Sequence, residues 1–192
     1  MTSNKNTTTS WPGTQALAGL ALALACSSPA LAGTSSGWAT GSDMLALGLP
    51  ALAAGAAWSQ GDSEGFRQLT YTMATTVGVA EVLKNTVHAM RPDGSDNKSF
   101  PSAHTAVAFA AVRYMDKRYG NELAPWTPWL YAAAGLTGVA RVEAHKHHWR
   151  DVAAGGALGW GAAQWWTEPV KGGQLAVVPT SGGVAMAWQR AW

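Results

Sequence analysis

Apolar positions recur with helical spacing along most of the chain, in long stretches separated by short polar segments. In the clearest stretch, each of the following positions lies three or four residues after the last: Leu69, Met73, Val77, Ala80, Lys84, Val87 and Arg91. This spacing places all of them on one face of a helix. The turn-forming residues at 92–97 predict a loop directly after that helix.

Four further stretches complete the helical pattern. They are 44–58, which Pro50 interrupts; Ser102 to the pair Gly120-Asn121; the segment that Pro125 and Pro128 open, through Leu130 to Arg141; and Val152 to Trp166. The tail differs, because apolar runs at 175–178 and 184–188 flank the turn-forming segment 179–183 and so predict a short C-terminal β-hairpin. We assign this hairpin no chemistry.

The first 32 residues have the pattern of an export signal. A small and apolar run covers Ala16 to Ala25, and Ala30-Leu31-Ala32 matches the small-x-small pattern that signal peptidase cleaves. We predict a signal peptide at 1–32, one helical domain at 33–172 and a tail at 173–192; an ordinary N-terminal helix is the alternative to the signal peptide. Cys26 is the only cysteine, and its preceding residues do not fit a lipoprotein signal. A mature chain without cysteine fits an exported, periplasmic protein.

The composition suits one apolar domain. Of the 192 residues, 47% are hydrophobic and only 12% are charged, about half the usual charged share. A net charge of +2 without a basic tract argues against nucleic-acid binding. Membrane association stays open: Trp165-Trp166 and the glycines at 155 and 159 are typical of membrane helices, whereas 125–140 and 152–166 are shorter than the roughly 20 residues that span a bilayer.

Two short motifs gather groups that bind phosphate. Lys84 and Arg91 lie seven residues apart, so on one helix face they can grip neighbouring oxygens of a phosphate. Ser102 follows a proline at the start of the next helix, and the first N–H groups of a helix attract anions. The Ser102 hydroxyl and the Ala103 N–H would add donors, with His104 in the same turn.

The third motif supplies a nucleophile. Arg141 is followed after five residues by His147, and His147 after three more by Asp151. If this segment is helical, the Asp151 carboxylate can hydrogen-bond to one nitrogen of the His147 ring and leave the other free to attack phosphorus. A metal site formed with His145 and His148 is the alternative, although the spacing matches no usual zinc pattern.

Taken in order, the three motifs resemble those of the type 2 phosphatidic acid phosphatases and of the acid phosphatases and vanadium haloperoxidases that share their site. The family pattern is Lys, six residues, Arg-Pro; then Pro-Ser-Gly-His; then Ser-Arg, five residues, His, three residues, Asp. Residues 84–151 follow it in the right order with both internal spacings kept. Two positions depart, because Ala103 replaces the glycine and Ala140 replaces the serine. Neither change removes a group that makes or breaks a bond.

The resemblance implies an all-α bundle of about five to six helices with the site at one end. It implies that His147 attacks phosphorus to form a phosphohistidine, that Asp151 stabilises the imidazolium, and that His104 protonates the leaving oxygen and then activates water. The groups that would hold the phosphate are Lys84, Arg91, Ser102, Ala103 and Arg141. No metal or other cofactor is needed, and vanadate is expected to inhibit.

The implied function is hydrolysis of phosphate monoesters or diphosphates. The apolar helices and the 11 tryptophans favour a lipid-linked phosphate as substrate. Three alternatives stay open: a non-specific soluble acid phosphatase, a vanadium-dependent haloperoxidase, and an inactive homologue that binds phosphate or lipid. The localisation that goes with the export signal is periplasmic, either soluble or at the inner membrane with the site facing the periplasm.

Overall fold

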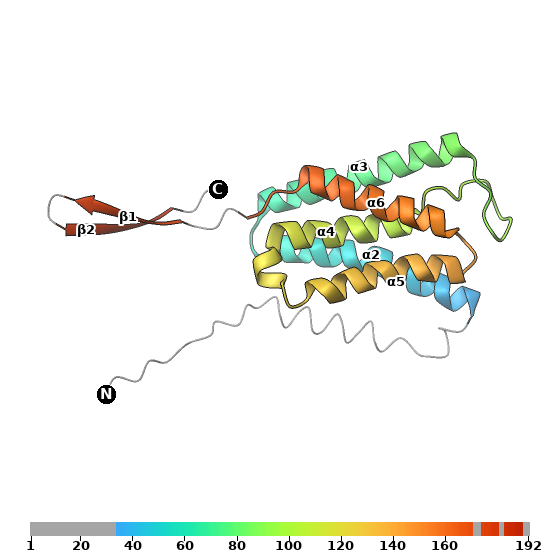
Figure 1. The fold of residues 1–192 in the computed structure, drawn as a ribbon, viewed down its shortest axis with the longest axis horizontal. Coiled ribbons are helices and arrows are strands. Elements are labelled where there is room, and N and C mark those ends of the chain that lie inside the picture. The colour runs from blue at the N-terminus through green and yellow to red at the C-terminus, as the bar shows by residue number, and fades with distance from the viewer. Residues whose placement is uncertain (1–33, 171–173, 181–182, 190–192) are drawn as a thin grey trace, which may run out of the picture.

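The structure, a computed structural model, describes residues 34–170, 174–180 and 183–189. The predicted signal peptide at 1–32 lies outside the described residues. The described helices run side by side along one long axis (Figure 1). They are α2 (Ser35–Ser59), α3 (Ser63–Val87), α4 (Ala103–Leu123), α5 (Thr127–Glu143) and α6 (Trp149–Trp166). The all-α bundle expected from the sequence is confirmed by these five helices.

Helix α4 is the centre of the bundle, because it contacts each of the other four helices. Its buried side chains form most of the apolar core, among them Val112, Tyr114, Met115 and Leu123. Helix α6 approaches α4 closely through Gly155 and Gly159: a Cβ added at either glycine would overlap a backbone oxygen of α4 or of its N-cap. The glycine pair thus serves close helix packing, which fixes the start of α6 against the start of α4.

Two paired strands follow the helices. β1 (Gln174–Thr180) and β2 (Gly183–Gln189) are antiparallel, with Gln174 opposite Gln189. Within the described residues neither strand contacts a helix. The predicted hairpin is therefore not supported by any packing against the bundle, and the fold class is assigned from the helices alone.

Helix α3 ends earlier than the sequence pattern predicts. His88 adopts a left-handed conformation (φ 49°) directly after Val87, and the Ser99 N–H donates to the Ala89 carbonyl (2.9 Å). Pro92 also disfavours a helical conformation at the residue before it. The prediction that Lys84 and Arg91 share a helix face is therefore wrong: Arg91 lies in the loop between α3 and α4.

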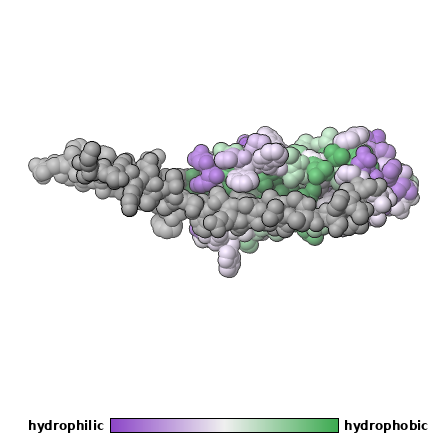
Figure 2. All heavy atoms as spheres, turned by 90° about the horizontal axis from the view of Figure 1, so that it is seen from below, coloured by the Kyte–Doolittle hydropathy of each residue, from purple (hydrophilic) through white to green (hydrophobic). Residues whose placement is uncertain are grey.

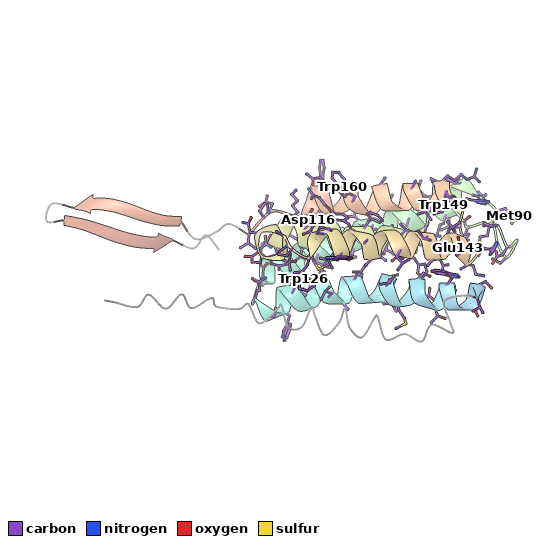
Figure 3. All side chains as sticks on the ribbon, turned by 60° about the horizontal axis from the view of Figure 1, so that its bottom comes forward. Met90, Asp116, Trp126, Glu143, Trp149 and Trp160 are labelled. Carbon is purple, nitrogen blue, oxygen red and sulfur yellow. The ribbon has the colours of Figure 1, made fainter. Side chains whose placement is uncertain are left out.

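Helix α4, in contrast, runs past its predicted end at Gly120-Asn121 to Leu123, across a kink at Tyr119. The starts of α2, α4 and α6 and the ends of α3 and α5 meet at one end of the bundle (Figure 1). In Figure 3 the labels of Met90, Glu143 and Trp149 mark that end. Seen from below, hydrophilic residues gather there, and hydrophobic surface lies along the middle of the bundle (Figure 2). No helix in 34–170 has both the length and the hydropathy needed to cross a bilayer.

Candidate active site

Two of the three predicted phosphate-binding cations lie at the end of α3 and in the following loop. Lys84 is buried, and its Nζ donates to the Lys98 carbonyl (3.0 Å). Burial lowers the pKa of Lys84, and the positive charge of Arg91 adds to this effect. Arg91 donates from Nε to Asp96 Oδ1 (2.7 Å) and from Nη1 to the Lys146 carbonyl (3.3 Å). The second bond ties the α3–α4 loop to the α5–α6 loop.

The third cation, Arg141, is buried near the end of α5. Its Nη1 donates to Ser42 Oγ (3.1 Å) and to Asp43 Oδ1 (3.3 Å), both on α2. Its Nε is buried and has no hydrogen-bond partner in the described part of the chain. A buried donor without a partner is costly, and a buried cation more so. An anion bound beside Arg141 would balance the charge of its guanidinium group.

His147 is almost completely buried, at 2% exposure. Its Nδ1–H donates to the Ser99 carbonyl (2.7 Å), and because a carbonyl only accepts, the neutral ring carries its proton on Nδ1. Nε2 therefore keeps its lone pair. Burial lowers the pKa of His147 to about 3, and the charges of Arg141 and Arg91 act in the same direction. The ring is neutral over the ordinary pH range, as a nitrogen nucleophile must be.

The expected hydrogen bond between His147 and Asp151 is not formed. Helix α6 begins at Trp149, after the histidine, and His147 Nδ1 lies 3.9 Å from Asp151 Oδ2. The carboxylate instead accepts from Ser99 Oγ (2.5 Å) and from the His148 N–H (2.8 Å). Asp151 thus holds the residue whose carbonyl fixes the His147 ring, so its influence on the tautomer passes through Ser99.

Ser102, Ala103 and His104 form the first turn of α4, as expected. Ser102 is the N-cap, and its hydroxyl pairs with Thr105 Oγ1 (2.9 Å). Ala103 is the first helical residue, where backbone N–H groups have no partner within the helix. His104 Nε2 lies 2.9 Å from Asp43 Oδ1. Burial and the charge of Arg141 lower the pKa of His104, and Asp43 opposes them.

Sequence reasoning missed three residues at this end of the bundle: Ser42, Asp43 and Ser99. Asp43 had a readable signal, because it is the single charged residue in the sequence of α2. Ser42 and Ser99 had none, since both act through hydrogen bonds to partners on distant segments.

The predicted alternative of a three-histidine metal site finds no geometric counterpart. His147 is buried, whereas His145 and His148 are exposed. Across the described residues, no three His, Cys, Asp or Glu side chains are grouped so as to hold a metal ion.

Comparison with known proteins places these residues within a family. The sequence model of the PAP2 superfamily matches residues 65–171, which is more than half of the chain. The chain belongs to the PAP2 superfamily. No solved structure matches it significantly.

Several curated proteins are similar to this PAP2 chain. The lipid A 1-phosphatase of Porphyromonas gingivalis is 36% identical over 91 residues, which cover 45% of this chain and 20% of that protein. The lipid A 4'-phosphatase of Helicobacter pylori is 32% identical over 123 residues, covering 57% and 60%. Lipid phosphate phosphatase 1 of Arabidopsis thaliana is 36% identical over 74 residues, covering 33% and 23%. The chain thus spans between a fifth and three fifths of these relatives.

Proposed function

We propose that this PAP2 chain is a phosphatase that hydrolyses lipid-linked phosphate esters through a phosphohistidine intermediate. The observation that carries the proposal is the convergence of three cations on His147. The charges of Lys84, Arg91 and Arg141 all act on a neutral imidazole, and the buried Nε of Arg141 has no protein acceptor among the described residues. A phosphoryl group, with three equatorial oxygens, offers enough acceptors for all three cations.

The chemical step follows from the free nitrogen of His147. Nε2 attacks phosphorus as the bond to the leaving oxygen breaks, and His104 gives its proton to that oxygen. The Ser99 carbonyl, which accepts from Nδ1–H, stabilises the positive charge that develops on the His147 ring. In the second step, neutral His104 takes a proton from water while the water oxygen attacks phosphorus and the P–N bond breaks. Phosphate then leaves and His147 is regenerated.

The cations and the start of α4 hold the equatorial oxygens. Lys84, Arg91 and Arg141 supply positive charge, and the Ala103 N–H supplies a backbone donor at the positive end of a helix dipole. Direct contact between phosphate and Ser102 requires its hydroxyl to turn away from Thr105, because that hydroxyl caps the helix in the structure.

Two observations favour a lipid-linked substrate. The relatives named above include two lipid A phosphatases and a lipid phosphate phosphatase. In addition, an apolar groove lies between α2 and α3, and its lining includes Pro50, Phe66, Met73 and Val77. Val77 is two helical turns from Lys84, about 10 Å along α3. A lipid whose phosphate is held by Lys84 can therefore place its acyl chain along this groove.

A phosphate-release panel tests the proposed function. The purified chain is given a lipid A precursor, phosphatidic acid, a diphosphate lipid and a soluble aryl phosphate, with His147→Ala as the blank. We expect release from the lipids at higher kcat/KM, no loss with a chelator, and inhibition by vanadate, which mimics five-coordinate phosphorus. Preference for the soluble ester would make the chain a non-specific acid phosphatase. Absence of release from all four substrates would contradict the proposal, as would activity that only zinc or magnesium restores.

The location of the chain stays a prediction. Fusing residues 1–40 to a reporter that is active only after export tests the signal peptide, and carbonate extraction of the full chain tests membrane association. A reporter that stays in the cytoplasm would contradict the export prediction.

A further inference from the structure

An acidic side chain reaches the cation-rich site from the helix to which the sequence analysis assigned no chemistry. Asp43 is the sole charged residue of α2. Its Oδ1 lies 2.9 Å from His104 Nε2 and 3.3 Å from Arg141 Nη1. One carboxylate oxygen thus joins the proposed general acid to one of the proposed phosphate-binding cations, and it does so from outside all three sequence motifs.

The contact decides which nitrogen of His104 can take part in the reaction. A carboxylate oxygen accepts hydrogen bonds, so Nε2 carries a proton that it donates to Asp43. Within the described residues, Nδ1 of His104 has no hydrogen-bond partner. The nitrogen available to a leaving oxygen or to a water molecule is therefore Nδ1.

We propose that Asp43 is a positioning residue for His104: it holds the Nε2–H so that Nδ1 exchanges the proton with the leaving oxygen and then with water. This inference rests on the proposed function. When the phosphorus–oxygen bond breaks, the Nδ1 proton passes to the leaving oxygen and His104 becomes neutral with its Nε2–H still on Asp43. When water attacks the phosphohistidine, Nδ1 takes a proton from that water and the P–N bond breaks.

The surroundings of His104 explain why a carboxylate is needed there. α3 contributes the cation Lys84, and α5 contributes the cation Arg141, and both disfavour a protonated ring. Other charged or titratable groups of this end include His147, Arg91, which pairs with Asp96, and Asp151, which is hydrogen-bonded to Ser99 and His148. Asp43 is the acidic group that contacts His104, and its charge and hydrogen bond act to raise the pKa of that ring.

A simpler role must be separated from this one, namely that Asp43 only holds Arg141 in place. The two roles differ in what they do to the leaving group. A general acid matters most when the leaving oxygen is strongly basic, as in an alkyl or lipid phosphate, and little when it is an aryl oxide such as p-nitrophenolate. Loss of a phosphate-binding contact weakens turnover of both substrates alike.

The test compares Asp43→Asn with the wild-type chain on an alkyl phosphate and on p-nitrophenyl phosphate. Asparagine keeps the size of the side chain and removes its charge. We expect kcat for the alkyl phosphate to fall about 10- to 100-fold and kcat for the aryl phosphate to fall by less than about threefold. The basic limb of the pH profile should also move to lower pH, because the protonated ring loses its carboxylate partner. Asp43→Glu should restore part of the alkyl phosphate activity.

Two matched variants complete the design. Glu122→Gln removes a negative charge from an exposed side chain at the far end of α4, about 30 Å along the helix from His104. This variant should leave kcat unchanged for both substrates. Ser42→Ala removes the neighbouring acceptor of Arg141 and leaves Asp43 in place. The inference would be overturned if KM and the vanadate inhibition constant rose equally, and by the same factor in Ser42→Ala and in Asp43→Asn. It would also be overturned if Asp43→Asn kept the wild-type kcat for both substrates.

A second measurement covers the case that Asp43→Asn does not fold. Nitrogen NMR of the wild-type chain should show neutral His104 protonated on Nε2, and the opposite tautomer would overturn the inference.

If the wild-type chain releases no phosphate from any substrate, the proposed function fails. If it releases phosphate while the variants contradict the pattern above, only the role of Asp43 fails.

Discussion

The two ends of the bundle each bury an arginine, but they neutralise its charge to different degrees. At the end away from the site, Arg118 donates from Nε and Nη2 to the two carboxylate oxygens of Asp62 (2.8 and 2.6 Å) and from Nη1 to the Glu168 carbonyl (2.9 Å). At the site end, Arg141 donates from Nη1 to α2, and its buried Nε has no partner among the described residues.

The pKa values of the two guanidinium groups record this difference. Burial acts to lower the pKa of Arg118, but the hydrogen bond and charge of Asp62 outweigh it, and the pKa is raised. Burial also lowers the pKa of Arg141; there Asp43 opposes the effect, the charge of Arg91 adds to it, and the pKa stays lowered. A paired cation stabilises the fold, whereas an underpaired one keeps its capacity to bind an anion.

The largest effect should come from removing the proposed nucleophile at the site end. His147→Ala should lower kcat by at least about 10⁴-fold, because it removes the ring nitrogen that attacks phosphorus. Steady-state phosphate release measures the loss, and circular dichroism checks the fold. The matched control is His148→Ala, an exposed neighbour that should retain turnover; loss in His148→Ala but not in His147→Ala would reverse the assignment.

Exchanging the two arginines for alanine should separate activity from stability. Arg141→Ala should lower kcat/KM about 10²- to 10³-fold, since it removes a donor to the phosphoryl group, and should change the melting temperature little. Arg118→Ala should destabilise the chain by about 3 kcal/mol, because it leaves Asp62 without its buried partner, and should keep kcat at temperatures where the chain is folded. Thermal melts and kinetics on both variants measure the contrast. If Arg118→Ala lost activity while folded, the two ends would not be independent.

The packing between α4 and α6 gives a smaller effect that links fold and site. Gly155→Ala should destabilise the chain by about 1–3 kcal/mol and lower activity, because the added methyl group pushes α6 away from the Ser102 carbonyl. Gly161→Ala lies on the same helix with no atom near its added methyl, so it should be neutral or stabilise the chain by about 0.5 kcal/mol. Equal melting temperatures for the two variants would contradict the close packing.

The pH dependence of kcat/KM should report the protonation states of His147 and His104. Activity requires neutral His147, so kcat/KM should fall as the pH drops through its pKa of about 3. Activity also requires protonated His104, so kcat/KM should fall as the pH rises through the pKa of that ring, which is lowered from the ordinary 6.5. We expect a bell-shaped profile with its maximum below pH 6.5. A maximum in the alkaline range would contradict these roles.

The sequence predicted the helices, because apolar spacing is a local signal, although α2 begins at Ser35 and not near residue 44. The motif spacing selected three cations and two histidines, and the structure brings them to one end of the bundle. Two predictions failed where a non-local contact decides the geometry: His88 and Pro92 end α3 before Arg91, and the Ser99 carbonyl, not the Asp151 carboxylate, holds the His147 ring. Asp43 was missed because the predicted helix began at residue 44 and because its partners lie on α4 and α5.

Trapping the covalent intermediate tests the central claim most directly. The chain is mixed with labelled substrate, quenched in alkali and digested, and the labelled residue is located by mass spectrometry, with NMR used to assign the phosphorylated nitrogen. We predict phosphate on Nε2 of His147, because Nδ1 donates to the Ser99 carbonyl. Phosphate on Nδ1 or on another residue, or turnover with no labelled protein in the burst phase, would contradict the account.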